Sequence, residues 1–102
     1  MSYVVRLLHV DGLHPAERQG AEEMYALALE DHLGGEIHVR RALLAWQSAS
    51  ERNRGQPLGR MPTPDIDAIS RWDHAQQVAR AAAMATLHAP YPKAIFEVHL
   101  RS

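Results

Sequence analysis

Seven histidines are the residues of this 102-residue chain best suited to acid–base or metal chemistry near neutral pH. Metal sites on helices commonly use two histidines four residues apart or a His-Glu-x-x-His motif, and the sequence contains neither pattern. His32 and His74 each follow an aspartate directly, and neighbouring residues of a helix point to different sides. We therefore predict no metal site and no cofactor, and read most of the histidines as surface or half-buried groups.

His9 and His99 are the two histidines that we single out as candidate binding residues. His9 continues the apolar alternation of the first predicted strand and precedes a turn, where polar groups often line a cleft. His99 lies on the polar face of the last predicted strand, two residues from Glu97. If these strands pair, one histidine meets a carboxylate and is able to act as an acid or base. The alternative is a structural histidine held by hydrogen bonds.

Three arginines flank a segment that is rich in glycine and proline, and they form a second candidate site: Arg52, Arg54 and Arg60. Guanidinium groups bind carboxylates and phosphates well, so this arrangement suits a small anionic ligand or an acidic protein segment. The spacing matches no phosphate-binding loop. The alternative is a solvated connector, which we expect over residues 53–62 because glycines and prolines interrupt regular structure there.

The two tryptophans, Trp46 and Trp72, fall on the apolar sides of predicted helices. Packing in the core or an interface is the first interpretation, and stacking on a ligand is the second. We expect Trp72 to pack against the sheet with Ile69 and Phe96. No serine lies in a Gly-x-Ser-x-Gly context, so no catalytic residue is assigned and enzymatic activity stays open.

These candidates must be positioned by two terminal strands and the helices between them. Residues 3–10 and 94–101 alternate in the way strands do, and both are rich in β-formers. Helices are predicted over 15–33, which ends at Gly34, and over 63–88, with Thr63 as the N-cap residue. Residues 36–52 are predicted as a helix by length and composition, although 37–43 also alternate like a strand.

The fold class predicted from this order is α+β, with the N- and C-terminal strands paired in a small sheet covered by about three helices. Two strands alone rarely make a stable sheet, and their open edges invite further pairing. We therefore expect a homodimer that completes the sheet. The alternative is a monomer in which residues 36–44 supply a third strand.

Composition limits the function classes. A hydrophobic fraction of 46% and a charged fraction of 23% are typical of one soluble globular domain, which we assign to residues 1–102. No apolar run is long enough for a membrane span, and the chain has no cysteine, so we expect a cytoplasmic protein without membrane contact. Seven acidic residues lie within 11–36 and five arginines within 37–64, at a net charge of −1. This balance favours protein contacts over nucleic acid.

Two functions follow from the sequence. The first is a small interaction or accessory protein that acts as a homo-oligomer, with a protein as its partner, and the absence of a catalytic motif favours it. The second is a small-molecule binding protein or enzyme with a pocket between sheet and helices, lined by histidine and arginine. A deep pocket that contains both residue types favours the second function, and a solid core favours the first.

Overall fold

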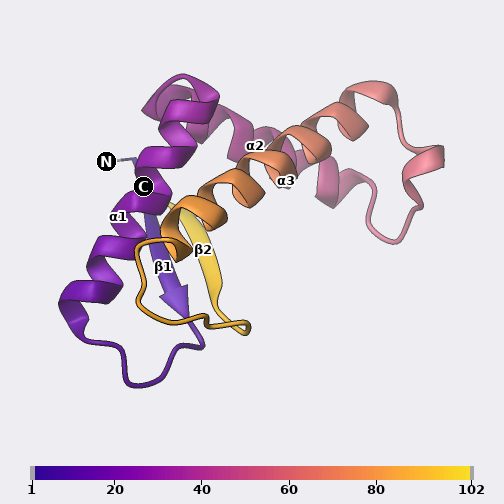
Figure 1. The fold of residues 1–102 in the computed structure, drawn as a ribbon. Helices are drawn as coiled ribbons and strands as arrows, with labels where there is room; N and C mark the ends of the chain where they lie inside the picture. Colours follow the sequence, from indigo (N-terminus) through magenta and orange to yellow (C-terminus); the bar gives the residue numbers. More distant parts are fainter. Residues whose placement is uncertain (1, 102) are drawn as a thin grey trace.

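The structure is a computed structural model that describes residues 2–101, and its elements follow the predicted order (Figure 1). They are β1 (Tyr3–Leu8), α1 (Pro15–Leu33), α2 (Glu36–Arg52), the 3-10 helix η1 (Leu58–Arg60), α3 (Thr63–Met84) and β2 (Ile95–Leu100). The strands form a two-stranded antiparallel sheet, which confirms the α+β class. Residues 36–44 belong to α2, so the third-strand alternative is wrong.

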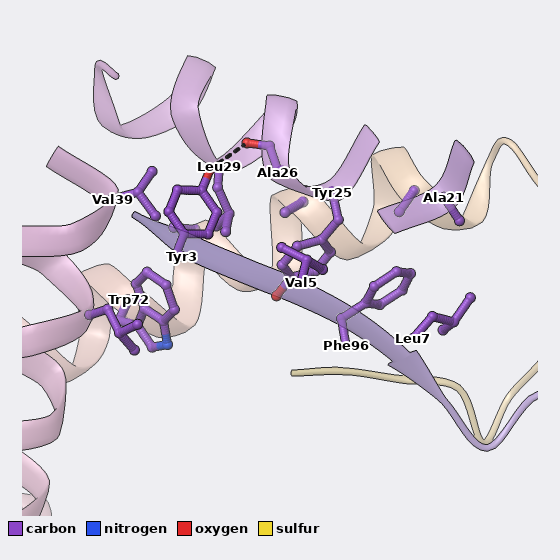
Figure 2. Packing of buried hydrophobic residues seen from close by; sticks show 14 of the residues in the cluster. Tyr3, Val5, Leu7, Ala21, Tyr25, Ala26, Leu29, Val39, Trp72 and Phe96 are labelled. Carbon is purple, nitrogen blue, oxygen red and sulfur yellow. Dashed lines mark hydrogen bonds between the residues drawn. The ribbon is translucent and has the colours of Figure 1, made fainter. Parts of the chain in front are cut away.

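One face of the sheet forms the floor of the hydrophobic core. Tyr3, Val5 and Leu7 of β1 are buried, and Phe96 of β2 lies opposite Leu7 in the ladder. Figure 2 shows these side chains directed towards α1, where Phe96 stacks on Tyr25 with ring centroids 4.5 Å apart. The alternation that puts His99 on the polar face of the last strand therefore correctly puts Phe96 on the buried face.

Helix α1 begins and ends where the sequence predicts. Pro15 occupies the first turn, and the imidazole of His14 accepts a hydrogen bond from the Ala16 N–H at 3.1 Å, which caps the helix. Gly34 follows the last turn with φ of 99°, a left-handed conformation that glycine adopts without a Cβ clash. Its N–H donates to the Glu30 carbonyl at 2.8 Å and so closes the helix end.

Helix α3 packs against α1 and α2 through small side chains. Ala75, Ala79 and Ala83 are fully buried at a spacing of four residues, so a neighbouring backbone approaches this side of the helix closely. Trp72 is 1% exposed and lies near Val39 and Tyr3 (Figure 2). The structure does not show the expected contact between Trp72 and Phe96. Tyr25 covers Phe96, and Trp72 packs at the other end of the sheet, near Tyr3.

Both ends of α3 differ from the prediction. The N-cap residue is Pro62 rather than Thr63, since the Asp65 N–H donates to the Pro62 carbonyl at 3.0 Å. The helix ends at Met84 instead of about His88. Thr86 donates to the Ala83 carbonyl through both its hydroxyl, at 2.7 Å, and its backbone N–H, and these short-range bonds close the helix early.

Candidate functional site

The residues predicted as a ligand site do not all converge on one place. His9 is exposed and lies after the end of β1, with φ of 62°. The predicted strand over residues 3–10 is thus two residues too long, and His9 does not continue the buried face. The left-handed backbone at this position turns the chain away from the sheet.

The three arginines have separate surroundings. Arg52 donates to Asp65 Oδ1 at 2.6 Å, and Asn53 donates to Oδ2 of the same carboxylate at 2.7 Å. The Arg52 and Asn53 hydrogen bonds hold the pKa of Asp65 below its usual value. Arg54 contacts Glu51 at 3.3 Å in an exposed pair, and Arg60 ends η1. Buried Asn53 also donates to the Ala49 carbonyl, so the connector after α2 is anchored at its first residue.

The tryptophans lie side by side, with ring centroids 6.5 Å apart. Trp72 belongs to the core, as the packing interpretation predicts. Trp46 is half-buried and, with Arg54, lines a surface hollow of about 450 Å³ on α2. The hollow brings together two of the predicted ligand residues, and the Arg54 guanidinium there is already paired with Glu51.

His99 lies beside a carboxylate of its own strand, so this contact does not depend on strand pairing. Its Nε2 lies 3.1 Å from Oε1 of Glu97, and both side chains are exposed on the outer face of β2. That outer face also carries half-buried Val4 and exposed Ile95. The face opposite the core is therefore part apolar and part charged.

The hydrogen-bond register decides which backbone groups point out of the sheet. The Arg101 N–H donates to the Ser2 carbonyl at 2.8 Å, so the position of Ser2 and Arg101 is one at which backbone groups point into the ladder. Such positions alternate along an antiparallel ladder. The even-numbered residues of β1 therefore bond to β2, and the N–H and C=O groups of Tyr3, Val5 and Leu7 point outwards.

Helix α1 covers part of this outer edge of β1. Glu22 accepts a hydrogen bond from the Leu7 N–H at 2.8 Å. Arg18 donates to the Leu7 carbonyl and, at 3.1 Å, to the Val10 carbonyl. Figure 1 shows α1 on the side of β1 away from β2. A further strand is therefore unable to pair along the whole of β1.

The outer edge of β2 has no such cover. By the same register, the N–H and C=O groups of Phe96, Val98 and Leu100 point away from β1. Among residues 2–101, no side chain or backbone group bonds them. Arg80 donates to the Ala94 carbonyl at 3.3 Å, immediately before the strand, so the open stretch begins at Phe96. The sequence pattern does not reveal this edge, because alternation reports side-chain faces only.

A cluster of basic side chains between α2 and α3 was also missed by the sequence reasoning. His38, Arg41 and Arg71 line a groove of about 440 Å³, together with Asp67 and small residues. No ion pair in the described part of the chain involves either arginine. The grouping depends on how α2 lies along α3, which residue spacing within one helix does not specify.

Two hollows lie beside the sheet. One of about 330 Å³ lies between α3 and the start of β2, next to Tyr25 and Phe96. The other, of about 540 Å³, lies between the end of α3 and the segment before β2, where His88 and Arg80 are part of its lining. His88 Nδ1 lies 2.8 Å from Glu17 Oε2, so this histidine already has a carboxylate partner.

No group of three or more metal-ligating side chains occurs within residues 2–101. Over the same range, no helix combines the length and apolar character needed to cross a bilayer. Comparison of the chain with protein-family models, curated proteins and solved structures gave no match.

Proposed function

We propose that this chain is a protein-interaction module that functions as a homodimer, and that the outer edge of β2 is its contact surface. The observation that carries the proposal is that the outward backbone groups of Phe96, Val98 and Leu100, on an otherwise regular strand, bond to nothing within residues 2–101. An exposed strand edge is a template for pairing with another chain, and proteins that do not use one usually block it. We further propose the cytoplasm as its location, a compartment that suits a cysteine-free chain.

The size of the sheet supports self-association. Two six-residue strands are a small sheet for a chain of 102 residues. Packing against α1 stabilises its inner face, and a further strand on the open edge adds to that stability. Pairing of two β2 strands around a two-fold axis gives one continuous four-stranded sheet. The same residues then serve both copies, as a two-fold interface requires.

A proline at Val98 tests this proposal. Its N–H points away from β1, so Val98→Pro removes no bond of the intramolecular ladder but blocks the outer edge. Val98→Thr is the matched control, because it retains the N–H and the β-branched shape. Light scattering at micromolar concentrations is expected to give twice the chain mass of 11.4 kDa for the unmodified chain and Val98→Thr. Val98→Pro is expected to give the single chain mass with an unchanged far-ultraviolet circular dichroism spectrum.

Two results oppose the proposal. A single-chain mass for the unmodified protein at these concentrations excludes the homodimer. A Val98→Pro variant that keeps twice the chain mass places the interface elsewhere. Unfolding of Val98→Pro does not end the test, since Val98→Lys blocks the same edge with a charge while keeping the backbone N–H.

A second candidate function is binding of a small anion in the groove between α2 and α3. The observation that favours it is the meeting of Arg41, Arg71 and His38 with a single acidic residue, Asp67. Titration calorimetry with inorganic phosphate tests it. Arg41→Ala and Arg71→Ala are each expected to weaken binding about tenfold or more, as loss of a charge-assisted hydrogen bond does. Arg54→Ala, outside the groove, is the control, and absence of phosphate binding to the unmodified chain rejects this function.

A further inference from the structure

We infer that two copies of β2 pair antiparallel in one particular register, with Val98 opposite Val98 of the second copy on the two-fold axis. This inference rests on the proposed function and specifies its partner as a second copy of this chain. It follows from three features of β2: the direction of its free backbone groups, its charge pattern, and the hollow beside it.

The backbone restricts the possible registers. Only even-numbered residues of β2 direct their N–H and C=O groups to the open edge. An antiparallel partner must therefore place even-numbered residues opposite even-numbered ones. Two symmetric registers satisfy this rule and pair most of the Ile95–Leu100 strand, one centred on Glu97 and the other on Val98.

The charges distinguish these two registers. Centring on Glu97 sets the two Glu97 carboxylates directly opposite each other, and like charges in that position destabilise a sheet. Centring on Val98 sets Glu97 opposite His99 of the second copy, twice by symmetry. Arg6 lies opposite Glu97 within its own chain in either case, so it does not favour one register.

The apolar side chains agree with the Val98 register. It places Leu100 of the second copy opposite Phe96, on the core side of the sheet. The hollow of about 330 Å³ beside Phe96 lies on this side, between β2 and α3. Val98 and Leu100 lie on the same face of β2 as buried Phe96, but they are only half-buried. Both side chains already pack against the core, and pairing in this register gives them further apolar neighbours and buries more of their surface.

Single-cysteine variants test the register without interference, because the chain contains no cysteine. In the Val98 register, Val98→Cys brings two Cα atoms about 5.5 Å apart, within the range that a disulfide spans. In the same register, Glu97→Cys places the two introduced cysteines of the dimer diagonal to each other, at about 7–8 Å, and His99→Cys does the same. A disulfide does not span that distance. Under mild oxidation, Val98→Cys is expected to give the cross-linked dimer on non-reducing gels, with several-fold less from either neighbour alone. An equimolar mixture of Glu97→Cys and His99→Cys is expected to cross-link as a heterodimer.

The outcomes separate this inference from the proposed function. Self-linking that is strongest for Glu97→Cys or His99→Cys overturns the Val98 register but retains the edge contact. Light scattering that shows a dimer, with no cross-link at any of the three positions, overturns the register and places the interface away from β2. A monomer in light scattering overturns both. The double variant Glu97→His with His99→Glu provides a second check: it exchanges the charges and is expected to keep the dimer, whereas His99→Glu alone is expected to weaken it.

Discussion

Leu7 and Phe96 lie directly opposite each other in the ladder, but their outward backbone groups have opposite surroundings. Those of Leu7 are bonded by the side chains of Glu22 and Arg18 from α1. Those of Phe96 have no partner among residues 2–101. The fold thus blocks one edge of the sheet near Leu7 and leaves the other edge accessible. This asymmetry is the physical basis for proposing the edge of β2 as the contact surface.

Replacement of Glu22 is expected to destabilise the chain by leaving the Leu7 N–H without a partner. The carboxylate accepts that bond at 2.8 Å, and an unsatisfied, partly buried donor costs about 1–3 kcal/mol. Urea unfolding of Glu22→Ala, measured at the same protein concentration as the unmodified chain, checks this value. Glu22→Gln keeps an acceptor oxygen and is the matched control. Equal stability of Glu22→Ala and Glu22→Gln would show that the α1 cover is not needed.

Trp72→Ala is expected to lower the free energy of unfolding by about 3–5 kcal/mol, the usual loss for a large aromatic side chain removed from a core. Trp72 is 1% exposed, belongs to the core cluster, and its ring centroid lies 6.5 Å from that of Trp46. Leu58→Ala is a suitable control, since Leu58 is 54% exposed. Chemical denaturation followed by circular dichroism measures both changes. A loss below about 1 kcal/mol for Trp72→Ala would contradict the packing described above.

Asp65 gives an expected pH dependence in acid. Its carboxylate accepts hydrogen bonds from Arg52 and Asn53, which lower its pKa from the usual value of 3.8. The resulting stabilisation is complete above that value and is lost as the pH falls through the lowered pKa. Asp65→Asn is therefore expected to melt at a lower temperature than the unmodified chain at pH 7, with a difference that shrinks in strong acid.

Thermal melts over this pH range test the Asp65 expectation. Arg54→Ala is the control, because Arg54 and Glu51 are 80% and 75% exposed and such a pair contributes little. The Arg54→Ala melting temperature should match that of the unmodified chain at each pH. If the difference in melting temperature between Asp65→Asn and the unmodified chain does not change with pH, ionisation of the Asp65 carboxyl does not contribute to stability as expected.

Tyr25 gives the corresponding expectation in alkali. Burial raises its pKa from 10.0 to about 12, against the opposing effects of a Gln76 hydrogen bond and the Arg80 charge. The unfolded chain ionises first, so stability is full below pH 10 and falls as the pH rises towards 12. Tyr25→Phe is expected to be less sensitive to alkali. Phenolate absorbance of the native protein, followed against pH, measures the tyrosine pKa values. Titration of every tyrosine near its usual pKa would contradict the raised pKa of Tyr25.

Much of the fold is predictable from the sequence because local patterns encode it. The strand alternation assigns Phe96 to the core, and Gly34 ends α1 as its backbone freedom suggests. The partners of these elements are less predictable. Trp72 does not reach Phe96, since the path of α3 across the sheet is a property of tertiary packing and Tyr25 takes that place.

The candidate site was harder to predict for a related reason. Side-chain alternation identifies the faces of β2, and it puts His99 and Glu97 on the same face, where their side chains meet. It does not tell whether the even- or the odd-numbered residues of β2 direct their backbone groups towards β1. That choice decides that the groups of Val98 lie on the open edge. Arg52 was likewise selected by its type as an anion-binding residue, whereas the turn into α3 gives it Asp65 as a partner.

Amide hydrogen exchange at Phe96, Val98 and Leu100, measured over a range of protein concentrations, tests the open-edge assignment most directly. In dilute solution these outward amides are expected to exchange fast, while the Leu7 amide stays protected by Glu22. As concentration rises, their protection is expected to increase together with the dimer mass. Exchange at all three amides that stays fast at every concentration, although light scattering shows a dimer, would contradict pairing through the edge of β2.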